Sequence, residues 1–170
     1  MSTFTAAELD DAFRGFQKTV AEIAQTRDWD RFAELFTDDA DYIEHALGTM
    51  SGREEIRRWI WKTMTAFPGS HMTGYPSLWH VVDAPTGRVI CEVDNPMRDP
   101  GDGTAITATN ITILTYAGDG LWSREEDVYN PMEFGQAAMR WCEKASALGT
   151  LDDDAARWME TFGAMFARRS

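Results

Sequence analysis

Four short segments rich in β-branched and aromatic residues constrain the fold of this chain more than any other feature. They cover residues 75–83, 88–95, 104–116 and 121–129. The sequences APTG, RDPGDG and AGDG lie between them, and Gly, Pro and Asp in such clusters favour turns. Successive strands joined by turns pair with their neighbours in antiparallel order. The pattern therefore predicts an antiparallel meander of four strands.

Helical periodicity marks the chain before these strands. Behind a capping-box sequence that starts at Thr5, apolar side chains recur at helical spacing and predict a helix over 6–25. A second, shorter helix and a strand at about 40–46 follow. A further one-sided helix is predicted from a capping box at Ser51 to the helix-stopping Pro68.

Two more helices are predicted after the last strand. Pro131 suits the first turn of a helix, Gly149 ends that helix, and Thr150 can cap a final one. The order of elements predicts an α+β fold, in which a cone-shaped, curved antiparallel β-sheet carries the N-terminal helices over its concave face, plus extra C-terminal helices. A pocket is expected between the sheet and these helices.

Charge and composition exclude several classes of partner. The net charge of −12 disfavours nucleic acid and anionic membranes. The sequence shows neither a signal peptide nor an apolar run of membrane length, so we expect a cytoplasmic location. Cys91 and Cys142 are far apart, which predicts two buried, reduced thiols. The three histidines lack the spacing of a metal pair, so we expect no metal and no cofactor.

Two segments carry a recurring family pattern. Residues 28–60 read as a Trp helix, an Asp-Asp-Ala turn, a short strand and Gly-Arg-Glu before an Ile-containing helix, and residues 116–131 contain Asp-Gly-x-Trp. This pattern resembles the SnoaL-like (polyketide cyclase-like) branch of the nuclear-transport-factor-2-like superfamily, related to ketosteroid isomerase and scytalone dehydratase. The resemblance covers about 6–131. It implies a SnoaL-like α+β barrel domain over 1–131 and a C-terminal helical extension of the same domain over 132–170.

The strand after the Asp-Asp-Ala turn holds the first catalytic candidates. Side chains alternate along a strand, so Tyr42 and Glu44 share one face and His45 lies on the other. The resemblance implies that the first face lines the cavity and that Glu44 stands where ketosteroid isomerase keeps its base. A carboxylate there can take a proton next to a carbonyl, and a phenol can stabilise the enolate. The alternative is a plain ion pair between Glu44 and Arg53. His45 binds substrate only if a bulge turns the strand.

Two more catalytic candidates come from the middle of the chain. His71 is expected to open the second strand, at the place where the resemblance implies a catalytic histidine of scytalone dehydratase. Asn110 interrupts an apolar strand, and a ligand can be the partner that its buried amide needs. Ala24 and Gln25 stand where that enzyme has a supporting Tyr–Asp pair, and its second histidine has no counterpart. These departures argue against that dehydratase mechanism.

Three further residues are candidates for substrate binding. Asp127 can face either the cavity or solvent. Asp94 ends its strand and can either join the site or cap the turn before Pro96. Trp59 and Trp61 are two residues apart on one helix, so only one of them faces inward. Trp59 is the candidate for the inner position.

Three kinds of function fit these residues. The resemblance favours a cofactor-free enzyme of lyase or isomerase type that acts by acid/base chemistry, as an isomerase, cyclase or dehydratase. Aromatic and Met side chains around a cavity favour a hydrophobic carbonyl or hydroxy substrate of aromatic, terpenoid or steroid-like shape. The alternatives are a non-catalytic domain that binds a small apolar ligand and a dimeric scaffold domain. The resemblance also implies a homodimer.

Overall fold

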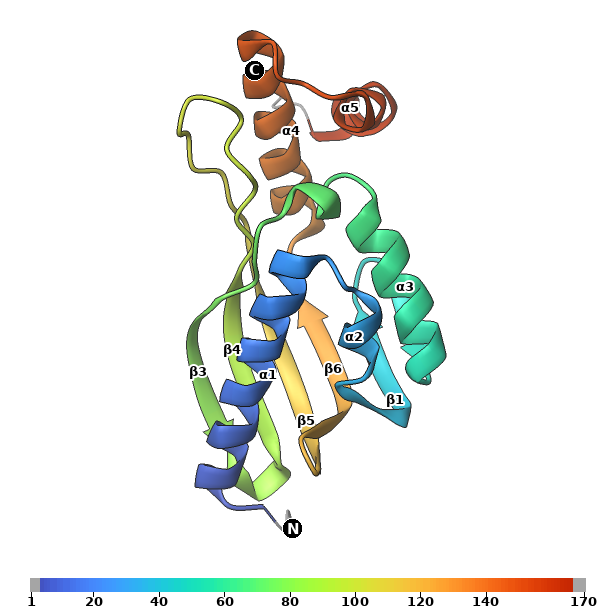
Figure 1. The fold of residues 1–170 in the computed structure, drawn as a ribbon, viewed down its shortest axis with the longest axis vertical. Coiled ribbons are helices and arrows are strands. Elements are labelled where there is room, and N and C mark those ends of the chain that lie inside the picture. Colours follow the sequence, from blue (N-terminus) through green and yellow to red (C-terminus); the bar gives the residue numbers. More distant parts are fainter. Residues whose placement is uncertain (1–3, 167–170) are drawn as a thin grey trace.

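One curved, six-stranded sheet forms the centre of the structure, a computed structural model that describes residues 4–166 (Figure 1). The strands are β1 (Phe36–Glu44), β2 (Gly48–Ser51), β3 (Ser77–Asp83), β4 (Arg88–Asp94), β5 (Thr109–Gly118) and β6 (Leu121–Val128). Their order across the sheet is β2-β1-β6-β5-β4-β3. The predicted meander is confirmed, because each strand from β3 to β6 pairs antiparallel with the next.

The first two strands differ from the sequence prediction. β1 begins at Phe36, before the predicted start at about residue 40, and it pairs parallel with β6. The short strand β2 was not expected. Met50 is its single buried residue, so the segment lacks the alternation by which a half-buried strand is recognised. β2 pairs antiparallel with β1 and forms the edge of the sheet.

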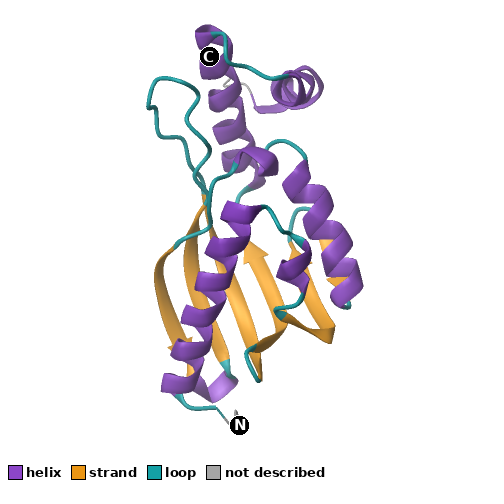
Figure 2. Ribbon diagram, viewed as in Figure 1, coloured by secondary structure: helices purple, strands orange, loops and turns teal. Residues whose placement is uncertain are grey.

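Three helices lie over one face of the sheet, and two extend beyond its end (Figures 1 and 2). The helices are α1 (Ala6–Thr26), α2 (Asp30–Ala33), α3 (Arg53–Thr65), α4 (Pro131–Leu148) and α5 (Asp153–Phe166), with short 3₁₀ turns η1 (Gly69–His71) and η2 (Ala84–Thr86). The predicted cap of α1 is confirmed, since the Thr5 hydroxyl accepts a hydrogen bond from the Glu8 amide at 3.2 Å. The six-stranded sheet and the helices that cover it confirm the predicted α+β fold class.

The predicted capping box at Ser51 is wrong. Gly52 occupies the N-cap position of α3 with a φ of 89°, a conformation that favours glycine, and no side chain caps the helix there. The Ser51 hydroxyl instead donates to Asp41, and the Ser51 amide donates to Glu55. The glycine turns the chain one residue later than the capping-box pattern requires.

The apolar core has two parts. The larger part lies between the sheet and the helices α1 to α3, and Phe13, Phe36 and Trp122 are among its fully buried members. The smaller part joins α4 and α5 to Phe67, Met97 and Ile106, which come from earlier in the chain. Both cysteines are buried and free, as expected. The boundary drawn at residue 131 stays a prediction, since this second core contains side chains from both sides of it.

Candidate functional site

Neighbouring positions on β1 and β6 bring the polar candidates together. The parallel register places Tyr42 beside Glu125 and Glu44 beside Asp127, and all four side chains belong to the inner, helix-covered face. Thr112 on β5 lies beside Asp127 on the same face. We call Tyr42, Glu44, Asn110, Thr112, Glu125 and Asp127 the acid cluster.

Asp127 is the centre of the hydrogen bonds in the acid cluster. Its carboxylate accepts from the Tyr42 hydroxyl, from the Thr112 hydroxyl at 2.5 Å and from the Asn110 amide at 3.0 Å. The Asn110 oxygen in turn accepts from the Asn95 amide at 2.9 Å, which fixes the orientation of the Asn110 side chain. Asp127 therefore faces the interior, which settles the alternative that the sequence left open.

Asp127, which is half-buried, and Glu125, which is buried, are two acids of the inner face with different properties. Burial raises the pKa of Asp127 to about 6, although hydrogen bonds from Thr112 and Tyr42 oppose that rise. Burial, together with the charge of Asp127, raises the pKa of Glu125 well above its ordinary value. Glu125 is only 5% exposed, and its Oε2 atom has no hydrogen-bond partner. Burial therefore disfavours the charged form of both acids, and Asp127, with a pKa of about 6, is still largely ionised near pH 7.

Tyr42 connects the acids to an aromatic wall. Burial and then the charges of Asp127 and Glu125 raise its pKa well above the usual value, so the phenol keeps its proton. The Trp59 ring on α3 lies 4.5 Å from the Tyr42 ring, centroid to centroid, and the indole nitrogen of Trp59 is buried without a partner. Trp61 is 56% exposed, so the expectation that only one of these tryptophans faces inward is confirmed.

Glu44 faces the interior but is engaged by a turn. Its Oε2 atom accepts from the backbone amides of Ala46 at 3.0 Å and Leu47 at 2.9 Å. The Tyr129 hydroxyl donates to the same carboxylate, and burial with this bond raises the pKa of Tyr129 well above the usual value. The alternative ion pair with Arg53 is wrong, because that guanidinium contacts the Phe36 carbonyl and pairs with Asp38 at 2.7 Å.

His45 and Asp94 lie outside the acid cluster. The side chain of His45 is 49% exposed on the outer face of the sheet, and its Nε2 atom pairs with Glu126 at 2.8 Å. No bulge turns it inward, because Tyr42, Ile43 and Glu44 keep an unbroken register against β6. Asp94 ends β4 and accepts a hydrogen bond from the Thr107 hydroxyl. Both side chains therefore bind partners outside the acid cluster.

His71 does not open a strand, and that expectation is wrong. It lies in η1, six residues before β3 begins at Ser77, and it is 5% exposed. Its Nε2 atom lies 2.7 Å from Asp152 and its Nδ1 atom 2.9 Å from the Ser70 hydroxyl. Burial lowers its pKa. The ring packs against Trp141 of α4, so the contacts of His71 run to the C-terminal helices and away from the acid cluster.

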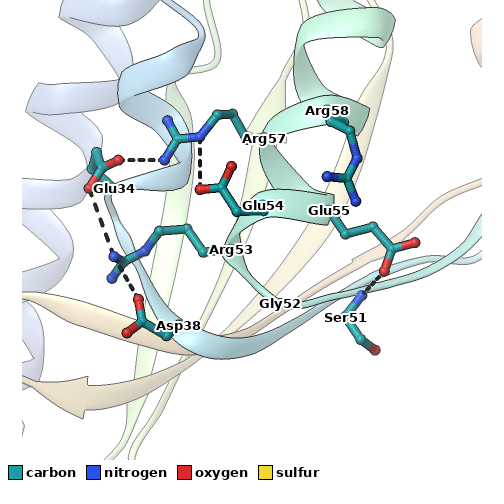
Figure 3. A pocket seen from close by; sticks show the side chains of 9 residues that line it. All are labelled: Glu34, Asp38, Ser51, Gly52, Arg53, Glu54, Glu55, Arg57 and Arg58. Carbon is teal, nitrogen blue, oxygen red and sulfur yellow. Dashed lines mark hydrogen bonds and ion pairs between the residues drawn. The ribbon is translucent and has the colours of Figure 1, made fainter.

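Two grooves of the described residues lie away from the acid cluster. One groove of about 430 Å³ is lined by charged side chains of α3 and of the chain near β1, shown in Figure 3. Two of its three arginines are paired within the groove, Arg57 with Glu34 at 2.5 Å and Arg53 with Asp38 at 2.7 Å. A second groove of about 350 Å³ lies between the end of α3 and α5. The acid cluster lines neither groove, so the expected apolar pocket is not confirmed.

The described residues contain neither a metal-binding group nor a membrane-spanning helix. Within residues 4–166, no group of three or more His, Cys, Asp or Glu side chains is arranged to hold a metal ion. Over the same residues, no helix has both the length and the apolar character needed to cross a lipid bilayer.

Sequence comparison identifies the family to which the chain belongs. The model of the SnoaL-like domain matches residues 16–125, more than half of the chain, and the protein belongs to that family. The matched region includes Tyr42, Asn110 and Glu125 and ends two residues before Asp127. No curated protein matches the sequence.

Three solved structures share the fold at low sequence identity. A Bacillus subtilis protein proposed to be an isomerase is 17% identical, with a TM-score of 0.60 over 79% of this chain and 95% of its own. A Catenulispora acidiphila protein with a ketosteroid isomerase-like fold, in complex with trimethylamine, is 21% identical, with a TM-score of 0.55 over 76% and 90%. A Sinorhizobium meliloti protein proposed to be a polyketide cyclase is 20% identical, with a TM-score of 0.51 over 74% and 100%. These similarities establish the nuclear-transport-factor-2-like fold.

Proposed function

We propose that this protein is a cofactor-free enzyme that moves a proton on a small hydrophobic carbonyl or hydroxy compound, as an isomerase, cyclase or dehydratase. One observation carries the proposal: a half-buried carboxylate with a pKa of about 6, Asp127, is held by a phenol on the inner face of the sheet. The family and a relative bound to a small organic molecule support a small-molecule site. A cytoplasmic location and a homodimer stay predictions from the sequence.

Asp127 is the base in this proposal. A carboxylate with a pKa near neutrality is ionised at pH 7 yet is basic enough to take a proton from carbon beside a carbonyl. Tyr42 donates to Asp127 in the free protein. Once Asp127 is protonated it becomes a poorer acceptor, and the Tyr42 hydroxyl can donate to the enolate oxygen instead. Asn110 and Thr112 hold the carboxylate in place.

We place the base at Asp127 rather than at Glu44, the first candidate from the sequence. The Oε2 atom of Glu44 already accepts two backbone amides of the turn that joins β1 to β2. A carboxylate that closes a turn is costly to move, because both amides would lose their partner. Asp127 has only side-chain donors, which can rearrange when a substrate enters.

Deuterium exchange tests this assignment without knowledge of the natural substrate. The protein is incubated in D₂O with hydrophobic cyclic ketones such as 2-tetralone, and NMR follows loss of the protons beside the carbonyl. Asp127→Asn should slow the catalysed exchange at least about a hundredfold. Glu126→Gln changes the neighbouring residue on the outer face and should leave the rate unchanged. Exchange by Asp127→Asn at the unaltered rate would refute Asp127 as the base.

The position of the two grooves favours a second candidate function. Because the acid cluster lines neither of them, a non-catalytic domain that binds a small apolar ligand or forms a dimeric scaffold fits that observation. Native mass spectrometry separates the candidates. A retained, chemically unchanged ligand without catalysed exchange indicates the binding domain, and a ligand-free dimer without exchange indicates the scaffold.

A further inference from the structure

We infer that the acid cluster selects a ligand that carries an ammonium group with apolar substituents, and that Glu125 pairs with that group. The inference deepens the proposed function, because it assigns a substrate class to the same site. Glu125 has no part in the proton transfer assigned above to Asp127 and Tyr42.

The charges of the acid cluster are not balanced within the protein. Glu44, Glu125 and Asp127 are three carboxyl groups on one buried face, and they influence one another's titration or that of Tyr42. Their hydrogen-bond partners are backbone amides, hydroxyls and the amide of Asn110. Among residues 4–166, no Lys, Arg or His forms an ion pair with any of the three. The acid cluster therefore carries acidic groups that no cationic side chain of the described residues balances.

Glu125 has a carboxyl oxygen that lacks a partner, although Tyr42 donates a hydrogen bond to the same carboxyl group. It is 95% buried, being 5% exposed, and its Oε2 atom makes no hydrogen bond. It shares the inner face with Tyr42, its neighbour in the β1–β6 register. A buried carboxyl group without a partner is costly, and either a bound proton or a paired cation removes the cost. A ligand cation beside Glu125 would give the Oε2 atom the partner that it lacks.

Aromatic side chains define the chemistry of that cation. The Tyr42 and Trp59 rings lie 4.5 Å apart, and the Tyr42 ring is also 6.2 Å from Phe36 and 6.3 Å from Phe32. Ring faces attract an ammonium group through the ring quadrupole, and they favour alkyl substituents by apolar contact. An organic ammonium satisfies both the rings and Glu125. A bare metal ion does not, and the described residues form no metal-binding group.

Binding should depend on pH because it displaces a proton. The titratable groups that interact with Glu125 are Tyr42 of β1, Asp127 of β6 and Cys91 of β4, whose pKa is raised to about 12 by burial and by the charges of Glu125 and Asp127. All of these are acids. A cation lowers the pKa of Glu125, so its affinity should rise with pH and binding should release protons to the buffer.

Calorimetry with two ligands of the same shape tests the inference. Choline carries a trimethylammonium group, and 3,3-dimethylbutan-1-ol replaces it with a neutral tert-butyl group. We expect the intact protein to bind choline at least tenfold more tightly, with proton release seen as a dependence of the heat on buffer ionisation. Glu125→Gln should remove that preference, and Glu126→Gln on the outer face should keep it. Circular dichroism establishes that each variant is folded, and Asp127→Asn offers a second variant with reduced cation affinity.

The outcomes separate this inference from the proposed function. Equal affinity for the two ligands, or binding of neither, would overturn the ammonium preference, while ketone exchange that depends on Asp127 would leave the proposed function intact. Conversely, a choline preference that depends on Glu125 would support the inference as a binding property. If the Asp127→Asn substitution then left the rate of ketone exchange unchanged, the enzymatic proposal would be refuted.

Discussion

At the scale of single residues, the acid cluster depends on side chains with little sequence signal. Glu125 was not among the candidates, because it lies within the charged run Arg124–Asp127, which is typical of a solvated strand. Its position becomes clear only from the register, where Tyr42 is its neighbour. The signal that could have found it is the alternation Glu125–Asp127, which places both acids on one face once Asp127 is known to face inward.

The raised pKa of Asp127 predicts a specific dependence of stability on pH. Folding moves this pKa from the ordinary value of 3.8 to about 6, so the folded state favours the protonated acid. The protonated Asp127 stabilises the folded state fully below pH 4. This stabilisation, about 3 kcal/mol in total, is lost as the pH rises through about 6. Asp127→Asn removes this dependence. Urea unfolding at pH 4, 5, 6 and 7 should therefore show the stability of the wild type relative to the variant declining over that range.

Glu126, a carboxylate on the outer face of the sheet, should show the opposite dependence of stability on pH. Hydrogen bonds from His45 and Arg124 lower the pKa of Glu126. Its contribution to stability is present above its unfolded pKa and is lost as the pH falls through the lowered folded value. Relative to Glu126→Gln, the wild type should therefore lose stability on acidification. The same trend for both variants would show that Asp127 has no raised pKa.

At the scale of elements, the position of η1 depends on a close approach to α3. A Cβ atom on Gly69 would lie 2.4 Å from the backbone oxygen of Thr63, so no larger residue fits without a shift of the backbone. This approach holds His71 under the C-terminal helices, where it bonds Asp152 at the start of α5. A histidine expected in a strand therefore packs against Phe67 and Trp141 of the smaller part of the core.

Two glycine substitutions test the close contact between η1 and α3. Gly69→Ala should lower the free energy of unfolding by about 1–3 kcal/mol, because the added methyl group overpacks the contact with α3. Gly15→Ala is the control: no atom lies within 4 Å of its added Cβ, and alanine in the interior of α1 should stabilise by about 0.5–1 kcal/mol. Chemical denaturation measures both. A neutral Gly69→Ala would mean that η1 and α3 are not in close contact.

At the scale of the whole molecule, periodicity and turn chemistry predicted the architecture better than the site. The meander, α1 with its cap, and both C-terminal helices follow from local sequence signals. The parallel pairing of β1 with β6 has no local signal, because it joins segments that are 85 residues apart at Tyr42 and Asp127. The sequence thus identified Tyr42, Asn110 and Asp127 as candidates, but it could not show that the first two donate to Asp127.

The two-part core predicts that the C-terminal helices are needed for stability. Phe67, Met97 and Ile106 are buried in the same cluster as Trp141 and Ala155. A chain that ends at residue 130 would expose these three side chains to water. We expect that chain to be insoluble or to lose cooperative unfolding, as measured by size-exclusion chromatography and urea denaturation. A soluble fragment with the unfolding midpoint of the full chain would instead show that 132–170 is dispensable.

The parallel pairing of β1 with β6 also has a consequence for the order of events during synthesis. Tyr42 leaves the ribosome early, but the acid that receives its hydrogen bond follows 85 residues later. Contacts over such a separation form late, because the intervening loop must first be closed. Until β6 emerges, the inner face of β1 has no neighbour on that side, and the nascent chain must keep its aromatic residues out of contact with other chains. Assembly of the acid cluster can therefore serve as a marker for completion of the sheet.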